Sequence, residues 1–109
     1  MVFTANRENG NRDVTVRYPN GEVKVLSPTE SQAIINHSPD GFNWGYGGSG
    51  PAQLALALLL QTTGSRKTAT RYYQDFKWDV IAKLAEQWEL TDTEISQWIQ
   101  DQNAKQTPL

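Results

Sequence analysis

Hydrophobic and polar residues alternate along residues 14–18 and again along residues 22–26. A period of two is typical of β-strands that bury one face. Pro19, Asn20 and Gly21 lie between the two segments, and the Asn-Gly dipeptide is favoured in tight hairpin turns because both residues tolerate positive φ. The pattern predicts a β-hairpin over residues 14–26. Its expected buried face consists of Val14, Val16, Tyr18, Val23 and Val25, with Arg17, Glu22 and Lys24 facing water.

Two further short segments are rich in residues that favour strands. Residues 2–4 precede the turn-rich residues 9–11, and residues 33–35 follow a Ser-Pro pair. We expect each segment to add a strand to the hairpin.

The second half of the chain shows helical patterns. Residues 51–62 are almost entirely apolar, with Ser49 or Gly50 as the expected cap and Gly64 just beyond the end, which predicts a helix buried on most sides. A second helix over residues 66–88 is predicted from apolar residues at helical spacing, namely Ala69, Tyr73, Phe76, Val80, Leu84 and Trp88. Its other side carries charges four residues apart, namely Arg71, Asp75, Asp79 and Lys83.

A third helix is predicted from the capping box that Thr91 and Glu94 would form. Leu90 and Ile95 fit the hydrophobic contact that accompanies such a box, and the inward face continues to Gln102. We expect the chain to fray over residues 103–109.

A run of strands followed by a run of helices predicts an α+β fold, in which a small N-terminal antiparallel sheet packs against three C-terminal helices. We expect residues 1–109 to form a single domain, with a β-rich part over residues 1–35, a Gly-rich loop over residues 36–50 and a helical part over residues 51–103.

Composition narrows the classes of function. Ten basic and twelve acidic residues give a net charge of −2, which argues against the basic surface of duplex nucleic-acid binders. The absence of cysteine excludes disulfides, thiol nucleophiles and Cys-ligated metal sites. No apolar run reaches membrane-spanning length, and the N-terminus has no secretory pattern, so we expect a cytoplasmic location without membrane insertion. No cofactor is expected.

The Gly-rich loop is the first candidate site. It ends in Trp44, Gly45, Tyr46, Gly47, Gly48, Ser49 and Gly50, just before the first C-terminal helix. Glycines let backbone N–H groups approach a ligand, and a helix start offers free donors and partial positive charge to a phosphate or carboxylate. The pattern fits neither a Walker loop nor a dinucleotide fingerprint. The alternative is a purely structural loop whose glycines let Trp44 and Tyr46 pack.

Two further candidates carry titratable groups. His37 is the sole histidine and would act as a general base oriented by Asp40, or would instead satisfy a polar contact in a turn. Asp75 and Asp79 lie four residues apart, as paired carboxylates do, although a solvated charge ladder explains the same spacing. The aromatic residues Tyr72 and Trp78 lie off the apolar stripe and would contact a partner, a base or the Gly-rich loop.

Residues 36–57, NHSPDGFNWGYGGSGPAQLALA, and residues 73–82, YQDFKWDVIA, together resemble a family of unknown function found in small proteins of bacteria, plasmids and phages. The resemblance implies no established activity. It implies that the two blocks meet in space, where His37, Tyr46, Ser49, Gln53, Asp75, Lys77 and Asp79 would form one constellation. Occurrence on mobile elements implies an inhibitor acting against a host defence system.

These observations favour a small non-enzymatic binding module that engages an anionic ligand, such as a nucleotide, or a partner protein. The expected binding residues are Trp44, Tyr46, Gly47, Gly48, Ser49, Gly50, Gln53, Asp75, Lys77 and Asp79. One alternative is a small hydrolase or transferase acting on a nucleotide or phosphoester, with His37 as general base and Asp40 or Asp75 orienting it. Another is nucleic-acid binding through Arg66, Lys67 and Arg71. The oligomeric state stays open, since a monomer and a dimer through Trp78 or Trp98 fit equally well.

Overall fold

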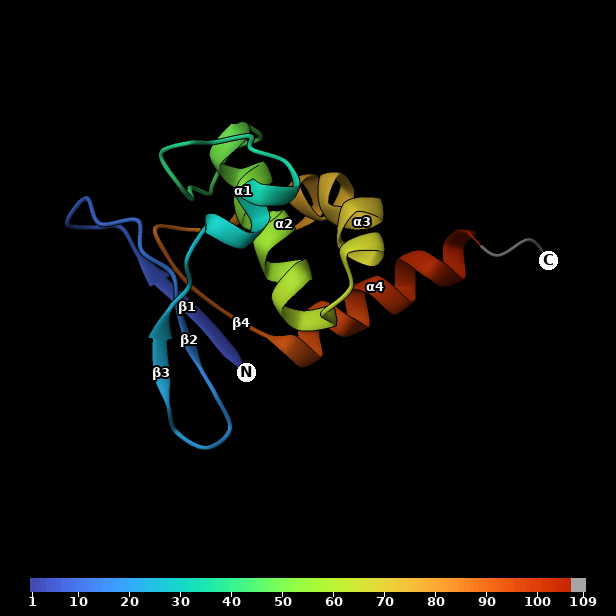
Figure 1. The fold of residues 1–109 in the computed structure, drawn as a ribbon, viewed down its shortest axis with the longest axis horizontal. Coiled ribbons are helices and arrows are strands. Elements are labelled where there is room, and N and C mark those ends of the chain that lie inside the picture. Colours follow the sequence, from blue (N-terminus) through green and yellow to red (C-terminus); the bar gives the residue numbers. More distant parts are fainter. Residues whose placement is uncertain (107–109) are drawn as a thin grey trace.

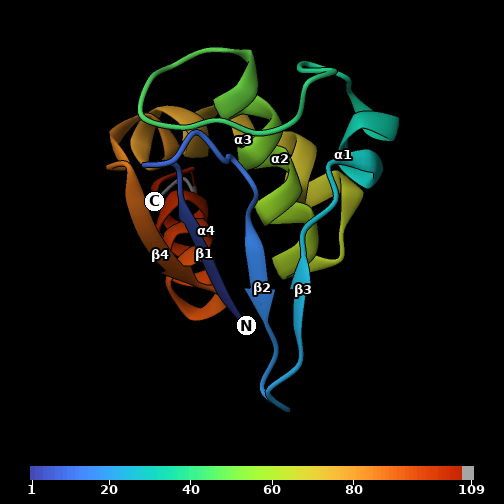
Figure 2. The ribbon, with the colours of Figure 1, turned by 90° about the vertical axis from the view of Figure 1, so that its left-hand side faces the viewer.

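The computed structural model describes residues 1–106. Its elements, in chain order, are β1 (Val2–Asn6), β2 (Thr15–Arg17), β3 (Val23–Val25), α1 (Thr29–Ile34), α2 (Ser49–Thr63), α3 (Arg66–Asp79), the 3₁₀ turn η1 (Ile81–Lys83), β4 (Gln87–Thr91) and α4 (Asp92–Gln106). The strands form one antiparallel sheet in the order β3-β2-β1-β4, and the helices cover one face of it (Figure 1 and Figure 2). The fold is α+β, as predicted. No helix in the described part of the chain has the length and apolar character needed to cross a membrane.

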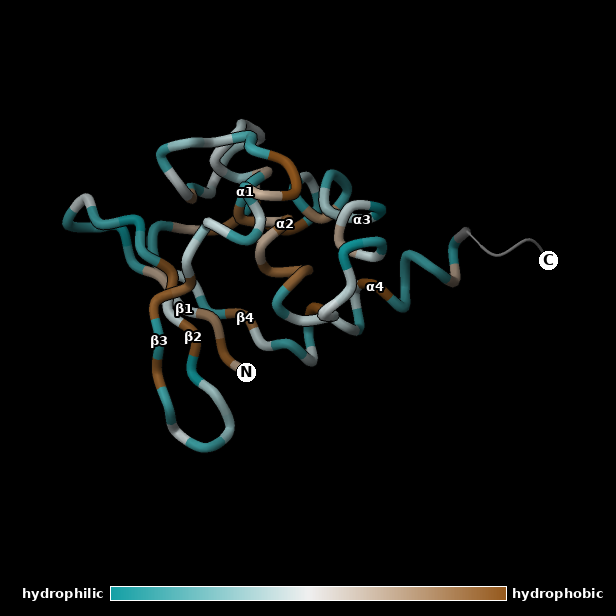
Figure 3. The backbone as a smooth tube through the Cα atoms, viewed as in Figure 1, coloured by the Kyte–Doolittle hydropathy of each residue, from teal (hydrophilic) through white to brown (hydrophobic). Residues whose placement is uncertain are grey.

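Helix α2 lies at the centre of the helical layer and contributes more buried apolar residues than any other element of the described chain. All ten residues from Gly50 to Leu59 are buried, and Gly64 ends the helix in the left-handed conformation at φ 64°. Helix α2 makes its most extensive contact with α3, and Figure 3 shows hydrophobic stretches along α2. The prediction of a helix buried on most sides is confirmed, although its N-cap is Gly48, one residue before the expected Ser49.

The hairpin forms, and Val14 and Val16 are buried as predicted, but Val23 and Val25 do not share their face. Val23 and Val25 are 60% and 61% exposed, because they pair with Arg17 and Thr15 and share the outer face of the sheet with them. The turn contains the three residues 19–21, whereas the predicted buried face requires a two-residue Asn-Gly turn, and only Gly21 has positive φ. One extra turn residue shifts the register by one and moves each side chain of the strand to the opposite face.

Residues 33–35 do not form the predicted strand. They belong to α1 and its C-cap, since the chain turns at Pro28 and Ser31 donates a hydrogen bond from Oγ to the Pro28 carbonyl oxygen (2.9 Å). The strand predicted at residues 2–4 is confirmed as part of β1.

The second predicted helix is too long. Helix α3 ends at Asp79, and β4 then pairs with β1 along its whole length, with Trp88 opposite Ala5 and Leu90 opposite Phe3. Val80, Leu84 and Trp88 lie at helical spacing, yet Trp88 and Leu90 also alternate with exposed Glu89. Pairing with β1 decides between the two periods. Because Lys83 lies beyond the helix, the predicted i,i+4 pair with Asp79 is also wrong.

Helix α4 begins at the predicted capping box. The Thr91 Oγ1 accepts a hydrogen bond from the Glu94 N–H, and the Glu94 Oε1 accepts one from the Thr91 N–H, each at 3.1 Å. The helix continues past Gln102 to Gln106, so the predicted fraying at residues 103–106 is wrong. The remainder of that prediction, residues 107–109, lies outside the described residues.

Candidate functional site

The Gly-rich loop begins at a buried amide that fixes its first residues. Gln53 on α2 is fully buried, and its Oε1 accepts hydrogen bonds from the backbone N–H groups of His37 (2.8 Å) and Ser38 (3.1 Å). Its Nε2 donates to Ser31 Oγ and to the Ile35 carbonyl oxygen. All the hydrogen-bonding groups of this side chain are thereby used to hold the loop to α1 and α2.

His37 lies against α3 rather than against a carboxylate. Its Nε2 is 2.8 Å from the Tyr73 hydroxyl, and the two rings are tilted with centroids 5.5 Å apart. Asp40 is exposed and lines a cavity beside Phe42, and no hydrogen bond joins it to His37 among the described residues. The structure therefore brings His37 together with Tyr73, and it does not bring Asp40 or Asp75 to the imidazole as an orienting acid.

Arg7, just after β1, fixes the middle of the loop. Its Nη1 donates hydrogen bonds to Asn43 Oδ1 and to the Trp44 carbonyl oxygen (2.7 Å), and its guanidinium lies 5.0 Å from the centroid of the Trp44 ring. Its Nε and Nη2 both donate to Glu86 Oε1, at 3.1 and 2.6 Å. These hydrogen bonds raise the pKa of Arg7 and lower the pKa of Glu86. One side chain thus joins three segments that are distant in the sequence.

Trp44 is part of the core. It is fully buried, and its ring meets the Trp88 ring edge to face at 5.7 Å. The next residue, Gly45, has φ 84° and donates its N–H to the Ile81 carbonyl oxygen (3.0 Å). This turn places Trp44 inside and Tyr46 outside, so the two predicted binding residues lie in different environments.

An exposed aromatic surface forms where the loop enters α2. Tyr46 and Trp78 are 49% and 56% exposed, and they are the only exposed aromatic residues of the described chain. A Cβ at Gly47 would overlap the Trp78 ring, and a Cβ at Gly48 would lie 2.5 Å from a ring carbon of Tyr46. Glycine at both positions therefore lets the backbone lie flat against the two rings. Gly50 is close-packed for another reason, because a Cβ there would meet Asn43.

Lys77 adds a cation to this surface. The residue is only 8% exposed, and its Nζ lies 4.3 Å from the centroid of the Trp78 ring. Its stem is buried while the ammonium reaches the surface. Within residues 1–106 the Lys77 ammonium forms no hydrogen bond or ion pair. We call Tyr46, Gly47, Gly48, Lys77 and Trp78 the Tyr46–Trp78 surface.

The first turn of α2 lies next to this surface and has the same sign of charge. Its N-cap, Gly48, offers no side-chain acceptor, and no acidic residue occupies the first turn. The free N–H groups of a helix start carry about half a positive charge. Ser49 is exposed at this end of the helix. The arrangement therefore offers an ammonium and backbone donors to a negatively charged group, and two aromatic rings to apolar parts of the same ligand.

The family described as a family of unknown function, DUF6166, matches residues 3–101. The chain belongs to DUF6166. Comparison with the curated proteins and with the solved structures gave no match.

Both ends of the DUF6166 match carry structural contacts of the site. Arg7 lies near its start, and Trp98 near its end donates a hydrogen bond from Nε1 to Asp79 Oδ2 (3.2 Å). Asp79 therefore holds α4 to the end of α3, next to Trp78. Asp75 is exposed one turn earlier on α3. The two aspartates predicted as a pair thus lie in different surroundings.

The two sequence blocks of the DUF6166 chain meet as the resemblance implied. Gly47 contacts Trp78 and His37 contacts Tyr73, so the loop lies along the C-terminal half of α3. The basic residues Arg66, Lys67 and Arg71 lie at the other end of α3, where Lys67 and Arg71 line a groove against α4.

Arg7 and Glu86 are the loop contacts that the sequence reasoning missed. Both stand in polar segments without a motif, and their partners lie more than thirty residues away. The signal that could have found them is the position of Arg7 a few residues beyond the strand predicted at residues 2–4, where a side chain can reach over the end of the sheet.

Proposed function

We propose that this protein is a non-enzymatic binding module that recognises an acidic segment of a partner protein through the Tyr46–Trp78 surface and the first turn of α2. The observation that carries the proposal is the Lys77 ammonium, which has a buried stem and no acceptor in the described chain. A carboxylate of the partner would supply that acceptor.

Two positive charges of this surface favour an anionic ligand, namely the Lys77 ammonium and the partial charge at the start of α2. The Lys77 ammonium lies at the surface without an accompanying anion among the described residues, and the start of α2 adds a partial positive charge beside the same surface. A bound carboxylate interacts favourably with both. In the protein without its partner, the cation–π contact with Trp78 holds the ammonium near the surface.

The shape of the surface favours a protein over a small molecule. Four cavities of the described chain lie along the sheet, beside β3, and between α3 and α4, and neither Tyr46 nor Trp78 lines any of these four. Exposed tyrosine and tryptophan on an open face are typical of residues that dominate protein interfaces. The expectation that the partner belongs to a host defence system concerns its identity and stays a prediction.

The geometry around His37 also supports binding rather than turnover. A general base needs its imidazole nitrogen free to take a proton from substrate. Here Nε2 is engaged by the Tyr73 hydroxyl, and no carboxylate hydrogen-bonds to the ring among residues 1–106.

A titration followed by amide NMR tests the proposal. The probes are a glutamate-rich peptide containing leucine, the matched lysine-rich peptide and inorganic phosphate. We expect the glutamate peptide to shift the amides of Ser49 and Gly50 and the indole of Trp78, with an affinity that falls as salt rises. Equal shifts with phosphate alone would assign a small anionic ligand instead, and no shift with either anion would refute the site.

The variant Lys77→Met separates binding from folding. Methionine keeps an unbranched stem and removes the charge, so we expect the thermal midpoint to stay or rise while peptide binding is lost. Lys67→Met, on the same helix but at its other end, is the matched control and should bind normally. A large loss of stability in Lys77→Met would show that the ammonium serves the fold instead.

A further inference from the structure

Strand β3 forms one edge of the sheet and is unusually open. Its neighbour on one side is β2, and the other side is unpaired in the described structure. Tyr18 N–H donates to the Glu22 carbonyl oxygen and Leu26 N–H donates to the Val14 carbonyl oxygen. In an antiparallel pair the hydrogen-bonded residues alternate. The N–H and C=O groups of Val23 and Val25 must therefore point away from β2.

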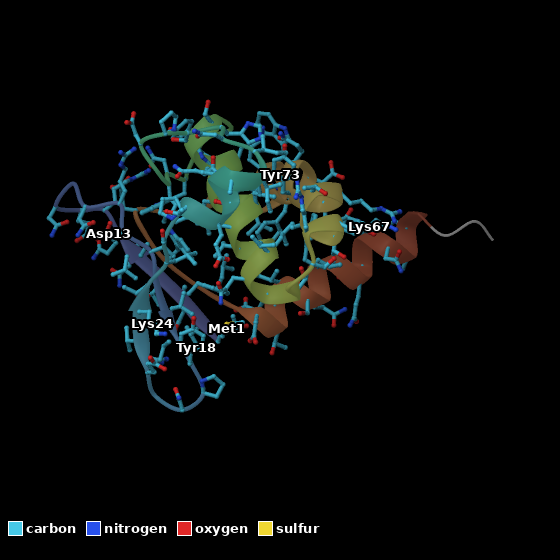
Figure 4. The ribbon with its side chains drawn as sticks, in the orientation of Figure 1. Met1, Asp13, Tyr18, Lys24, Lys67 and Tyr73 are labelled. Carbon is cyan, nitrogen blue, oxygen red and sulfur yellow. The ribbon has the colours of Figure 1, made fainter. Side chains whose placement is uncertain are left out.

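Cavities flank this edge on both faces of the sheet, and Val25 lines all three of them. The first, of about 780 Å³, lies on the outer face between β3 and Glu89. The second, of about 620 Å³, lies beyond the end of β3 and contains Asp13 and Asp40. The third, of about 140 Å³, lies on the inner face near Tyr18 and Lys24. Figure 4 shows Asp13, Tyr18 and Lys24 together at the end of the molecule that the sheet forms.

We infer that β3 accepts an extended, basic segment of a partner protein as a fifth strand of the sheet. Main-chain hydrogen bonds to Val23 and Val25 would give affinity, and the cavities on the two faces would receive alternate side chains. The inference is independent of the proposed function, because the edge and the Tyr46–Trp78 surface share no residue.

The charged residues around β3 indicate which kind of segment would bind there. Asp13, Asp40 and Glu89 line the two larger cavities, and none of them forms an ion pair within the described residues. Arg12 is the one basic residue lining these cavities. The excess of carboxylates therefore fits lysine or arginine side chains of an incoming strand.

Lysine on an edge strand commonly protects the edge from pairing. Lys24 is held differently, because its Nζ lies 3.4 Å from Glu22 Oε1 and 6.0 Å from the centroid of the Tyr18 ring. Its partner across the sheet is Val16, a residue of the helix-facing side. The side chain thus leaves the outward N–H and C=O groups of its two neighbours uncovered.

The test uses the full chain and synthetic peptides of alternating valine and lysine, with matched peptides of valine and glutamate and an N-methylated valine–lysine peptide. We expect the valine–lysine peptide to shift the amides of Val23 and Val25 and to slow their hydrogen exchange. The glutamate peptide should bind at least about tenfold more weakly, and N-methylation should abolish binding because it removes the main-chain donors.

Protein variants test the charge argument. Asp13→Asn combined with Asp40→Asn should weaken the valine–lysine peptide about threefold to tenfold, as expected for two exposed ion pairs. Asp75→Asn combined with Asp101→Asn, which removes the same charge from the helical side, should have no effect. Equal binding of both peptides, or shifts outside β3, would overturn the inference. Protection of Val23 and Val25 that grows with protein concentration alone would assign the edge to a second copy of the chain.

Discussion

The Arg7 guanidinium donates from two nitrogens to one oxygen of Glu86 while its third nitrogen donates to the backbone carbonyl of Trp44. The end of β1, the Gly-rich loop and the segment before β4 are joined at this point. The Arg7 N–H also donates to the Glu86 carbonyl oxygen (3.1 Å), so backbone and side chain act on the same pair of segments.

Removing this guanidinium should loosen the loop. In Arg7→Met we expect the free energy of unfolding to fall by about 1–3 kcal/mol, the usual effect of losing charge-assisted hydrogen bonds to a partly buried group. Amide exchange should accelerate at residues 44–48 more than elsewhere. Arg17→Met, on the outer face of β2, is the control and should change neither quantity. Unchanged exchange in the loop of Arg7→Met would show that packing of Trp44 alone holds it.

The same pair predicts a pH dependence of stability. The pKa of Glu86 lies below its ordinary value of 4.5 because Arg7 donates hydrogen bonds to the charged form. The contribution of this carboxylate is therefore complete above about pH 4.5 and is lost as the pH falls through the lower folded pKa. Unfolding by denaturant at a series of pH values should show a shallower acid decline in Glu86→Gln than in the parent chain. Identical declines would contradict it.

Gln53 should contribute more to stability than its polarity suggests. It is fully buried on α2 and makes four hydrogen bonds, two of them to backbone N–H groups of the loop. Gln53→Leu leaves those two N–H donors without their acceptor and removes the bonds to Ser31 Oγ and the Ile35 carbonyl oxygen, which should cost about 2–4 kcal/mol of unfolding free energy. Gln61→Leu on the same helix is the matched control. Its amide is only partly buried, so its cost should stay below about 1 kcal/mol.

Local signals in the sequence account for the parts of the fold that were predicted. The apolar run of α2, the left-handed Gly64 after it and the capping box at Thr91 are each decided within a few residues. The failures depend on distant partners. Val80, Leu84 and Trp88 continue the helical period of α3, whereas Trp88 and Leu90 fit a strand period, and pairing with β1 makes residues 87–91 a strand. The exposure of Val23 follows from a turn one residue longer than Asn-Gly alone indicates.

In the candidate site, too, local signals predicted some features, while features that depend on the folded chain were missed. Glycines before a helix marked the Tyr46–Trp78 surface, and the block containing Lys77 and Trp78 proved to lie against them. The sequence pattern does not separate Trp44, which is buried, from Tyr46, which is exposed, because their difference depends on the positive φ of Gly45 between them.

Gly47 is the position where the loop and α3 touch, and it offers a test confined to the surface. Its φ is not positive, so alanine meets no backbone strain there. The added Cβ would overlap the Trp78 ring, which is more than half exposed and can swing outward. We therefore expect Gly47→Ala to cost less than about 1 kcal/mol of unfolding free energy and to change the tryptophan fluorescence.

The double variant Gly47→Ala with Trp78→Ala shows whether that contact is the cause. With the ring absent, the alanine at position 47 should cost no further unfolding free energy. The cost of the double variant should therefore be lower than the sum of the two single costs, by most of the Gly47→Ala effect. Gly10→Ala serves as the contrast, because its strain comes from φ 86° rather than from a neighbour and no second substitution relieves it. Additive costs at Gly47 and Trp78 would mean that the glycine is required by the backbone of the loop and not by the ring that lies on it.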